Sequence, residues 1–501
     1  MGSERSRYPI SRRRLLTSVL LAIGLTAALS ARLSHPELHT DEITYMSSVL
    51  ESMVQGTVLP VQGNGELFIN KPPLSLWLMR LSSEVLDPSP FAARLPSILA
   101  AVATAVVLYL FGAAVFGETV GVLAALVFVF APGLLMLHGI RSATPDSLEI
   151  LLITSAIVSL EVWRRHRRSW SLACLVACVA ATAWVKSPFA LIVFVVYLLA
   201  TELPARRAGQ GTPRFGVTVA LVAGFWVGAY LLWLGTLSAA TSTGAVAKRL
   251  LLQQYVRRVE GRLGKHQAQS PSYYLETTAQ DFGPLLLLPA GAVTVGIAGR
   301  RKGQPLSRHD VACVVAWSLA APLLASASVN KLPWYAYLSY PGIALLVAVS
   351  AQHLAQAVSD RKSVQSALMA ASVVVLAWRM PADRVWPAEA QRRGMVGRLW
   401  EIASRDSDVV VVPAPDFQFP RQRDDGGREA RLFIRTLLWR SRSSPDSDAC
   451  RALLVNQNPG ASEWGDELNL HPPTRKSAGL WLVDDCNGWL VEQLTAAQSP
   501  D

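Results

Sequence analysis

The sequence predicts a polytopic α-helical membrane protein with about eleven transmembrane helices and a small external α/β domain at the C-terminal end. Three observations lead to this prediction. Hydrophobic residues make up 51% of the 501 residues and charged residues only 17%, whereas soluble domains carry about 25% charged residues. The mean hydropathy is +0.30, and the apolar residues are gathered in long blocks. The arginines cluster between those blocks. This composition excludes disordered, collagen-like and disulfide-rich miniprotein classes.

The excess of basic over acidic residues also fits a membrane protein. The chain has 47 Lys and Arg against 36 Asp and Glu, a formal net charge of +11. In a soluble protein such an excess would favour nucleic-acid binding. Here the arginines lie between apolar blocks, so they indicate membrane orientation, and no nucleic-acid partner is expected. The five cysteines have no metal-ligand spacing and predict neither a zinc module nor a redox motif.

The first apolar block, Leu15 to Leu33, follows three arginines at 12–14. It is predicted to be the first span. Ala-Leu-Ser-Ala at 28–31 would also serve as a cleavage site, so a signal peptide stays an alternative. In both cases the basic flank remains in the cytoplasm and the following loop is external.

Ten further apolar blocks are each near the twenty-residue spanning length. They run roughly over 95–116, 120–138, 147–163, 170–185, 188–203, 215–237, 283–299, 311–328, 337–353 and 364–379. Only Lys186-Ser187-Pro188 separates the fourth block from the fifth, so one long bent helix is the alternative there. The arginine-rich loops at 164–168, 206–214 and 300–308 all fall on the cytoplasmic side if the N-terminus is inside. An odd number of spans then places the C-terminal region outside.

The predicted division is therefore a membrane domain over residues 1–380, with external loops at about 34–93 and 238–282, and an external soluble domain over 381–501. Short β-like runs in the second domain predict an α/β fold; they are Val409 to Val412, Leu453 to Val455 and Leu480 to Val483. Cys450 and Cys486 lie in the same domain. In an oxidising compartment they either pair or remain two separate buried thiols.

The first external loop carries an acidic pair. Asp41 and Glu42 follow the first span, and charged groups at a membrane surface are costly unless they are paired or used. The alternative is a helix N-terminus, with Thr40 as cap and the two acids in the first turn.

Two motifs follow the acidic pair in the same loop. They are Asn70-Lys71-Pro72-Pro73, before an aromatic-containing stretch, and Arg94-Leu95-Pro96-Ser97 at the next span. In this order and spacing the motifs resemble the C-type glycosyltransferase superfamily, in the branch of bacterial aminoarabinose transferases and protein O-mannosyltransferases.

The resemblance covers roughly residues 12–355. Its further elements are Arg141 to Asp146 before a span, Trp184-Val185-Lys186-Ser187-Pro188, the later loop Gln254 to Tyr274, and Asn330 to Tyr335 followed by Tyr340-Pro341. One position departs from it. Asn70 stands where the aminoarabinose branch has an acid, which counts against a metal site that would need that acid.

The resemblance implies an enzyme of the bacterial plasma membrane. It would transfer a sugar from a polyprenyl-phosphate donor to a lipid, protein or glycan acceptor on the external face, with inversion. An acceptor hydroxyl needs a base as it attacks, and Asp41 is the candidate. Fixed cations would stabilise the departing phosphate; the candidates are Lys71, Arg94, Arg141 and Lys331, for each of which snorkelling toward lipid headgroups is the alternative.

The remaining candidates are less specific. Asp146 is the second predicted catalytic carboxylate: it would orient Arg141, bind the sugar or hold a divalent metal ion, and a plain helix N-cap is the alternative. Glu42, Tyr45 and Tyr335 are expected at the substrate. His266 is a candidate metal ligand, against the common occurrence of histidines in exposed loops.

Two other functions compete with glycosyl transfer. A transporter or flippase would predict inverted repeats and acids in the middle of spans, whereas this chain has its acids at span ends and long external loops. A non-catalytic scaffold that binds the envelope through its C-terminal domain would keep the same fold without turnover.

Overall fold

The computed structural model describes residues 11–33, 40–62, 66–69, 71–136, 138–186, 188–240, 269–297, 307–329, 331–359 and 361–379, with three strands at 409–413, 451–455 and 480–484. The chain divides into two units. The first comprises Met1–Leu33, Ile69–Leu78 and Arg94–Trp386, and the second Ser34–Phe68, Met79–Ala93 and Pro387–Asp501.

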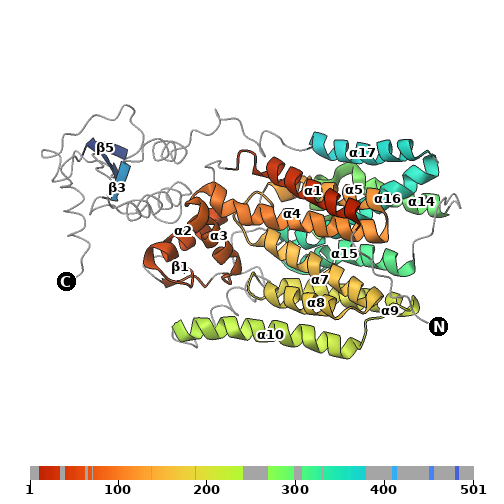
Figure 1. Ribbon diagram of the computed structural model, residues 1–501, viewed down its shortest axis with the longest axis horizontal. Helices are drawn as coiled ribbons and strands as arrows, with labels where there is room; N and C mark the ends of the chain where they lie inside the picture. The colour runs from red at the N-terminus through yellow and green to blue at the C-terminus, as the bar shows by residue number, and fades with distance from the viewer. Residues whose placement is uncertain are drawn as a thin grey trace. The chain divides into compact units, whose positions relative to one another are not determined.

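The first unit is a helical bundle (Figure 1). Each predicted apolar block contains a helix, because a backbone in lipid has to satisfy its own hydrogen bonds. The helices are α1 (Arg12–Ser30), α4 (Pro90–Val115, which begins in the second unit), α5 (Glu118–Val129), α6 (Pro132–Leu135), α7 (Asp146–His166), α8 (Ser169–Thr182), α9 (Phe189–Arg207), α10 (Phe215–Ala240), α13 (Tyr273–Phe282), α14 (Leu287–Ile297), α15 (Arg308–Ser326), α16 (Tyr340–Val358) and α17 (Lys362–Arg379).

Prolines decide several boundaries that hydropathy leaves open. The block at 120–138 is not one helix, since α5 ends at Val129 and Pro132 opens the short α6. Two helices occupy 170–203 and not one bent helix. Helix α8 ends at Thr182, and α9 begins at Phe189 directly after Pro188, which disfavours helical geometry in the residue before it.

Six of the described helices are long and apolar enough to cross a membrane: α1, α4, α9, α10, α15 and the segment Pro333–Val358, which contains α16. Three shorter helices are also apolar: Glu118–Val129, Ser169–Thr182 and Lys362–Val375. The prediction of a multi-pass helical membrane protein is confirmed, and the number eleven stays a prediction.

Helix α16 is the centre of the bundle and packs against α5, α14, α15 and α17. Small residues allow close helix approach there. A Cβ atom on Gly342 of α16 would lie 2.7 Å from the Trp317 side chain of α15. A Cβ atom on Gly112 of α4 would lie 2.8 Å from Cα of Gly121 on α5. Larger residues at either glycine would push the two helices apart.

In the second unit, α2 (Thr40–Gln55) begins at Thr40 and carries Asp41 and Glu42 in its first turn. The acidic pair thus lies at a helix N-terminus, where the helix dipole stabilises carboxylates. A short antiparallel pair follows, β1 (Val61–Gln62) with β2 (Glu66–Leu67). Phe68, next to β2, contacts the ring of Tyr45 edge-on at 6.1 Å. Most of α3 (Leu74–Leu86), from Met79 on, belongs to this unit as well.

The C-terminal region contains one described sheet. The strands β3 (Val409–Pro413), β4 (Arg451–Val455) and β5 (Leu480–Asp484) have β4 in the middle, parallel to β3 and antiparallel to β5. All three predicted strand runs are therefore strands. The rest of the predicted α/β domain, including Cys450 and Cys486, lies outside the described residues.

Candidate active site

Asp146 is the centre of a buried polar cluster in the first unit. It is the first residue of α7 and is 2% exposed. Its Oδ1 accepts a hydrogen bond from Lys186 Nζ at 2.6 Å, and its Oδ2 lies 3.3 Å from His138 Nδ1. Both oxygens of this carboxylate are therefore engaged by cationic or imidazole groups.

Lys186 lies between α8 and α9 and is paired with two carboxylates. Its Nζ is also 3.5 Å from Glu149 Oε2 and 5.8 Å from the centre of the Tyr335 ring. Burial lowers the pKa of Lys186, but the charges of Asp146 and Glu149 outweigh burial and the net shift is upward. The lysine is thus fully protonated at neutral pH. Lys71 acts electrostatically on Glu149, so two lysines face two carboxylates.

His138 joins this cluster to a distant segment. Its ring stacks on Trp334 with centroids 3.8 Å apart and planes 18° apart. Its φ of 55° lies in the left-handed region, which is sparsely populated by residues other than glycine and is often found at functional sites. The contact with Asp146 and the stack on Trp334 hold this backbone in place.

Asp281 of α13 fixes the helix that precedes His138. Its Oδ1 accepts a hydrogen bond from the backbone nitrogen of Gly133 at 2.9 Å, and its other oxygen accepts one from the Tyr340 hydroxyl. A Cβ atom on Gly133 would lie 2.2 Å from that carboxylate, so only glycine allows the contact. The Tyr337 hydroxyl donates to the Gly133 carbonyl at 2.8 Å. Helix α6, and with it the turn to Asp146, is anchored to α13 and α16.

Arg94 and Arg141 meet at the C-terminal end of α1. Arg94 Nη1 donates to the Leu33 carbonyl at 3.0 Å, and Arg141 Nη2 donates to the Ala31 carbonyl at 2.9 Å. Cations are favoured there by the helix dipole. Burial, with a smaller contribution from the charge of Arg94, lowers the pKa of Arg141 to about 10. Arg141 therefore stays charged at neutral pH, and an anion bound beside it would be stabilised.

Lys331 is buried, at 8% exposure, and its amine donates to carbonyl oxygens. The acceptors are Ser328 at 3.0 Å and Gln269 at 3.4 Å. The next residue, Leu332, exchanges hydrogen bonds with the Tyr274 hydroxyl of α13. A lysine held by carbonyls keeps its full charge available to an anion.

The structure brings some predicted site residues together. Asp146 and Tyr335 lie beside Lys186, Lys71 acts electrostatically on Glu149, and Lys331 is in the same segment as Tyr335. Asp146 bonds Lys186 and His138, while Arg141 bonds α1. In the second unit, Glu42 is fully buried, Tyr45 is 4% exposed and Asp41 is half-buried. Asn70 and His266 lie outside the described residues.

Four candidate functional residues were not predicted from the sequence: His138, Glu149, Lys186 as a site residue, and Trp334. Two had a usable signal. Glu149 is an acid one turn into an apolar helix, and Lys186 is a lysine between two apolar blocks, both unusual in membrane segments unless paired. His138 and Trp334 carry no local signal, because their stacking joins residues far apart in the sequence.

Comparisons with known proteins agree with this description. A profile of the family described as dolichyl-phosphate-mannose-protein mannosyltransferase matches residues 70–233. No curated protein sequence matches the chain. The solved structure of ArnT from Cupriavidus metallidurans bound to undecaprenyl phosphate matches with a TM-score of 0.62 at 15% identity, over 98% of this chain and 100% of that one. The chain has the C-type glycosyltransferase fold. The apo structure of the same ArnT matches with a TM-score of 0.58 at 13% identity, over the same shares.

The C-type glycosyltransferase resemblance inferred from motifs is thus confirmed at the level of fold. The matched family segment contains six of the candidate site residues: Lys71, Arg94, Arg141, Asp146, Glu149 and Lys186. Lys331 and Tyr335 lie beyond it, and Asp41 lies before it.

Proposed function

We propose that this protein is a glycosyltransferase of the bacterial plasma membrane that moves a sugar from a polyprenyl-phosphate donor to a lipid, protein or glycan acceptor on the external face. One observation carries the proposal. A buried lysine bonds the first residue of α7, and two arginines close to one another bond the end of α1, in a fold shared over 98% of this chain with an ArnT solved with undecaprenyl phosphate. Such cations suit a lipid phosphate.

The proposed reaction is a single displacement with inversion. The acceptor hydroxyl oxygen forms a bond to the anomeric carbon while the bond from that carbon to the phosphate oxygen breaks. Asp41 takes the hydroxyl proton. Polyprenyl phosphate leaves with its negative charge stabilised by Lys71, Lys331, Arg94 and Arg141. The full burial of Glu42 beside the half-buried Asp41 supports Asp41 as the base.

Asp146 has a positioning role in this proposal. A carboxylate bonded to Lys186 on one oxygen and to His138 on the other is poorly placed to accept a further proton. It instead holds the start of α7 against Lys186. Tyr335 and Trp334 offer aromatic faces beside the cluster, which suit a sugar ring or an isoprenoid chain.

Transfer of a radiolabelled sugar from polyprenyl phosphate by the purified protein tests the proposal. Release of polyprenyl phosphate in step with labelled product supports it. Movement of the intact donor across a vesicle membrane without cleavage would indicate a flippase, and binding to envelope glycans without either activity would indicate a scaffold.

Lys71→Ala and Lys331→Ala are each expected to lower the rate of transfer by about tenfold or more. The reason is the loss of one charge-assisted contact to phosphate, at least about 1.4 kcal/mol. The measurement is the initial rate at limiting donor. Lys362→Ala on α17, an exposed lysine, is the matched control and should keep the wild-type rate. Near-normal rates in both site variants would indicate that these lysines only extend toward lipid headgroups.

The proposed topology has the N-terminus in the cytoplasm, a membrane domain over 1–380 and an external domain over 381–501. The arginine-rich loops support this orientation. A reporter that fluoresces only in the cytoplasm, fused after Asp501, is therefore expected to be dark, and the same reporter placed before Arg12 to be bright. Fluorescence from the C-terminal fusion would overturn the odd number of spans.

A further inference from the structure

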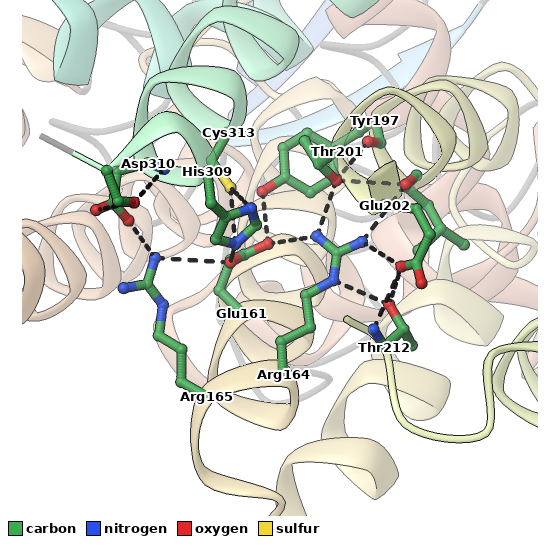
Figure 2. A network of polar contacts seen from close by, with 12 residues as sticks. Glu161, Arg164, Arg165, Tyr197, Thr201, Glu202, Thr212, His309, Asp310 and Cys313 are labelled. Atoms are coloured by element: carbon green, nitrogen blue, oxygen red, sulfur yellow. Dashed lines mark hydrogen bonds and ion pairs between the residues drawn. The ribbon is translucent and has the colours of Figure 1, made fainter. Parts of the chain in front are cut away.

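A second buried polar cluster lies toward the other end of α7. Glu161 of α7 is surrounded by Arg164 and Arg165 of the same helix and by His309 of α15 (Figure 2). Fifteen helical residues separate Glu161 from Asp146, about 22 Å at 1.5 Å per residue. This cluster is therefore distinct from the candidate active site, and its glutamate is fully buried.

Three potential metal ligands converge in it. Glu161, His309 and Cys313 are buried, and their ligand atoms all lie within 4.8 Å of one another. His309 and Cys313 are four residues apart on α15 and so share one face of that helix. The same nitrogen, His309 Nε2, lies 2.8 Å from Glu161 Oε2 and 3.4 Å from Cys313 Sγ.

These distances are close to those of a tetrahedral zinc site. Zn²⁺ takes Cys sulfur at about 2.3 Å and His nitrogen or carboxylate oxygen at about 2.0–2.2 Å, which separates nitrogen and sulfur by about 3.5 Å and nitrogen and oxygen by about 3.4 Å. The observed distance from Nε2 to the sulfur agrees, but the sulfur also lies 3.6 Å from His309 Nδ1. It therefore lies against the ring and would have to move toward the Nε2 side to share a metal ion with that nitrogen. The nitrogen–oxygen distance is that of a hydrogen bond and would have to open by about 0.6 Å, a small rotation of two side chains.

The charges of the cluster leave room for one more positive charge. Arg164 is bonded to Glu202 at 3.1 Å as well as to Glu161, and Arg165 to Asp310 at 2.7 Å. The cluster thus contains three carboxylates and two guanidinium groups, a net charge of −1. Arg206 also pairs with Glu202 at 2.7 Å, but its side chain is 58% exposed, and an ion pair that water reaches contributes little to the balance of the buried charges.

We propose that Glu161, His309 and Cys313 bind a divalent transition-metal ion of the zinc class. The ion would displace the Cys313 thiol proton to solvent, so the metal and the thiolate together add the single positive charge that the cluster lacks. Each guanidinium group keeps a carboxylate of its own, Glu202 or Asp310. The ion would join α7 to α15 and act as a structural crosslink.

The competing arrangement is metal-free, with His309 protonated and ion-paired to Glu161. It supplies the same single charge but gives Cys313 only a weak sulfur contact with His309 and no thiolate. The sulfur therefore discriminates between the two, and the test is built on it.

The experiment loads the purified full-length protein with Co²⁺ in place of Zn²⁺ and measures bound metal together with near-ultraviolet absorption. The wild type is expected to bind about one ion per chain and to show thiolate-to-cobalt charge transfer. Cys313→Ser should lose that absorption and bind the ion at least about tenfold more weakly, the minimum usually seen when a metal site loses a supporting group. Cys174→Ser, a half-buried cysteine on α8, is the matched control and should behave as the wild type.

Two results would overturn the proposal. One is wild-type protein without charge-transfer absorption at saturating Co²⁺, which needs no variant and so does not depend on whether Cys313→Ser folds. The other is absorption that survives in Cys313→Ser but disappears in Cys174→Ser, which would move the site to Cys174 and Cys178, whose sulfurs are 3.9 Å apart.

Discussion

Asp41→Asn is expected to lower the rate of sugar transfer by about 10²–10⁴-fold, the range typical of losing a general base. The substitution keeps the size of the side chain and most of its hydrogen bonds but removes the proton acceptor. Asp41 is half-buried in the first turn of α2, so the amide leaves the helix intact. The measurement is the single-turnover rate at saturating donor, with donor binding determined separately and expected to be unchanged.

Glu42→Gln is the matched comparison, since it makes the same change in the neighbouring acid. Glu42 is fully buried, and its replacement is expected to affect stability more than turnover. A wild-type rate for Asp41→Asn with an inactive Glu42→Gln would reverse the two roles. Full activity in both variants would place the base elsewhere.

Lys186→Met is expected to destabilise the protein by about 3–5 kcal/mol, the cost typical of removing one partner from a buried ion pair. The change leaves Asp146 and Glu149, at 2% and 3% exposure, without the ammonium that they share. The start of α7 should then shift, and transfer activity should fall with it. Denaturant unfolding in detergent, followed by circular dichroism, measures the stability.

Two variants control this result. Lys362→Met removes an exposed lysine from α17 and should leave stability unchanged. Adding Asp146→Asn to Lys186→Met removes one of the two stranded charges and should restore part of the lost stability. A Lys186→Met variant as stable as the wild type would show that the buried carboxylates of Asp146 and Glu149 do not need the Lys186 ammonium group for stability.

The sign of the pH dependence follows from the raised pKa of Lys186. Its pairing contributes stability that is fully present below the unfolded lysine pKa of about 10.4 and is lost only as the pH rises through the higher folded pKa. This contribution is therefore expected to stay constant between pH 6 and pH 9. The deficit of Lys186→Met should instead grow as the pH rises, because its stranded buried carboxylates are destabilising only when they are ionised.

Several elements were predictable from local sequence. Long apolar blocks located the helices, and three short β-branched or aliphatic runs located β3, β4 and β5. Pro188 was enough to separate α8 from α9. The failure at 120–138 shows the limit, because hydropathy alone does not register that Pro132 ends one helix and opens another.

The candidate site was predictable only in part. Motif resemblance selected Asp146 and Tyr335, which lie beside Lys186 in the structure, and Lys71, which acts electrostatically on Glu149. It did not select His138 or Trp334, because no pattern in the sequence indicates that the turn before α7 contacts the segment before α16. It also directed attention to His266 as a metal ligand, whereas among the described residues a potential ligand group forms at Glu161, His309 and Cys313.

Composition and hydropathy were sufficient to decide which segments become helices in a membrane, because transfer into lipid depends on the residues of one segment at a time. Pairing of buried polar side chains was decided only in three dimensions. Glu161 and His309 are 148 residues apart in the chain, and Lys186 and Asp146 are 40 apart. A buried charge is stable only beside a partner, and the partner is supplied by whichever helix packs alongside.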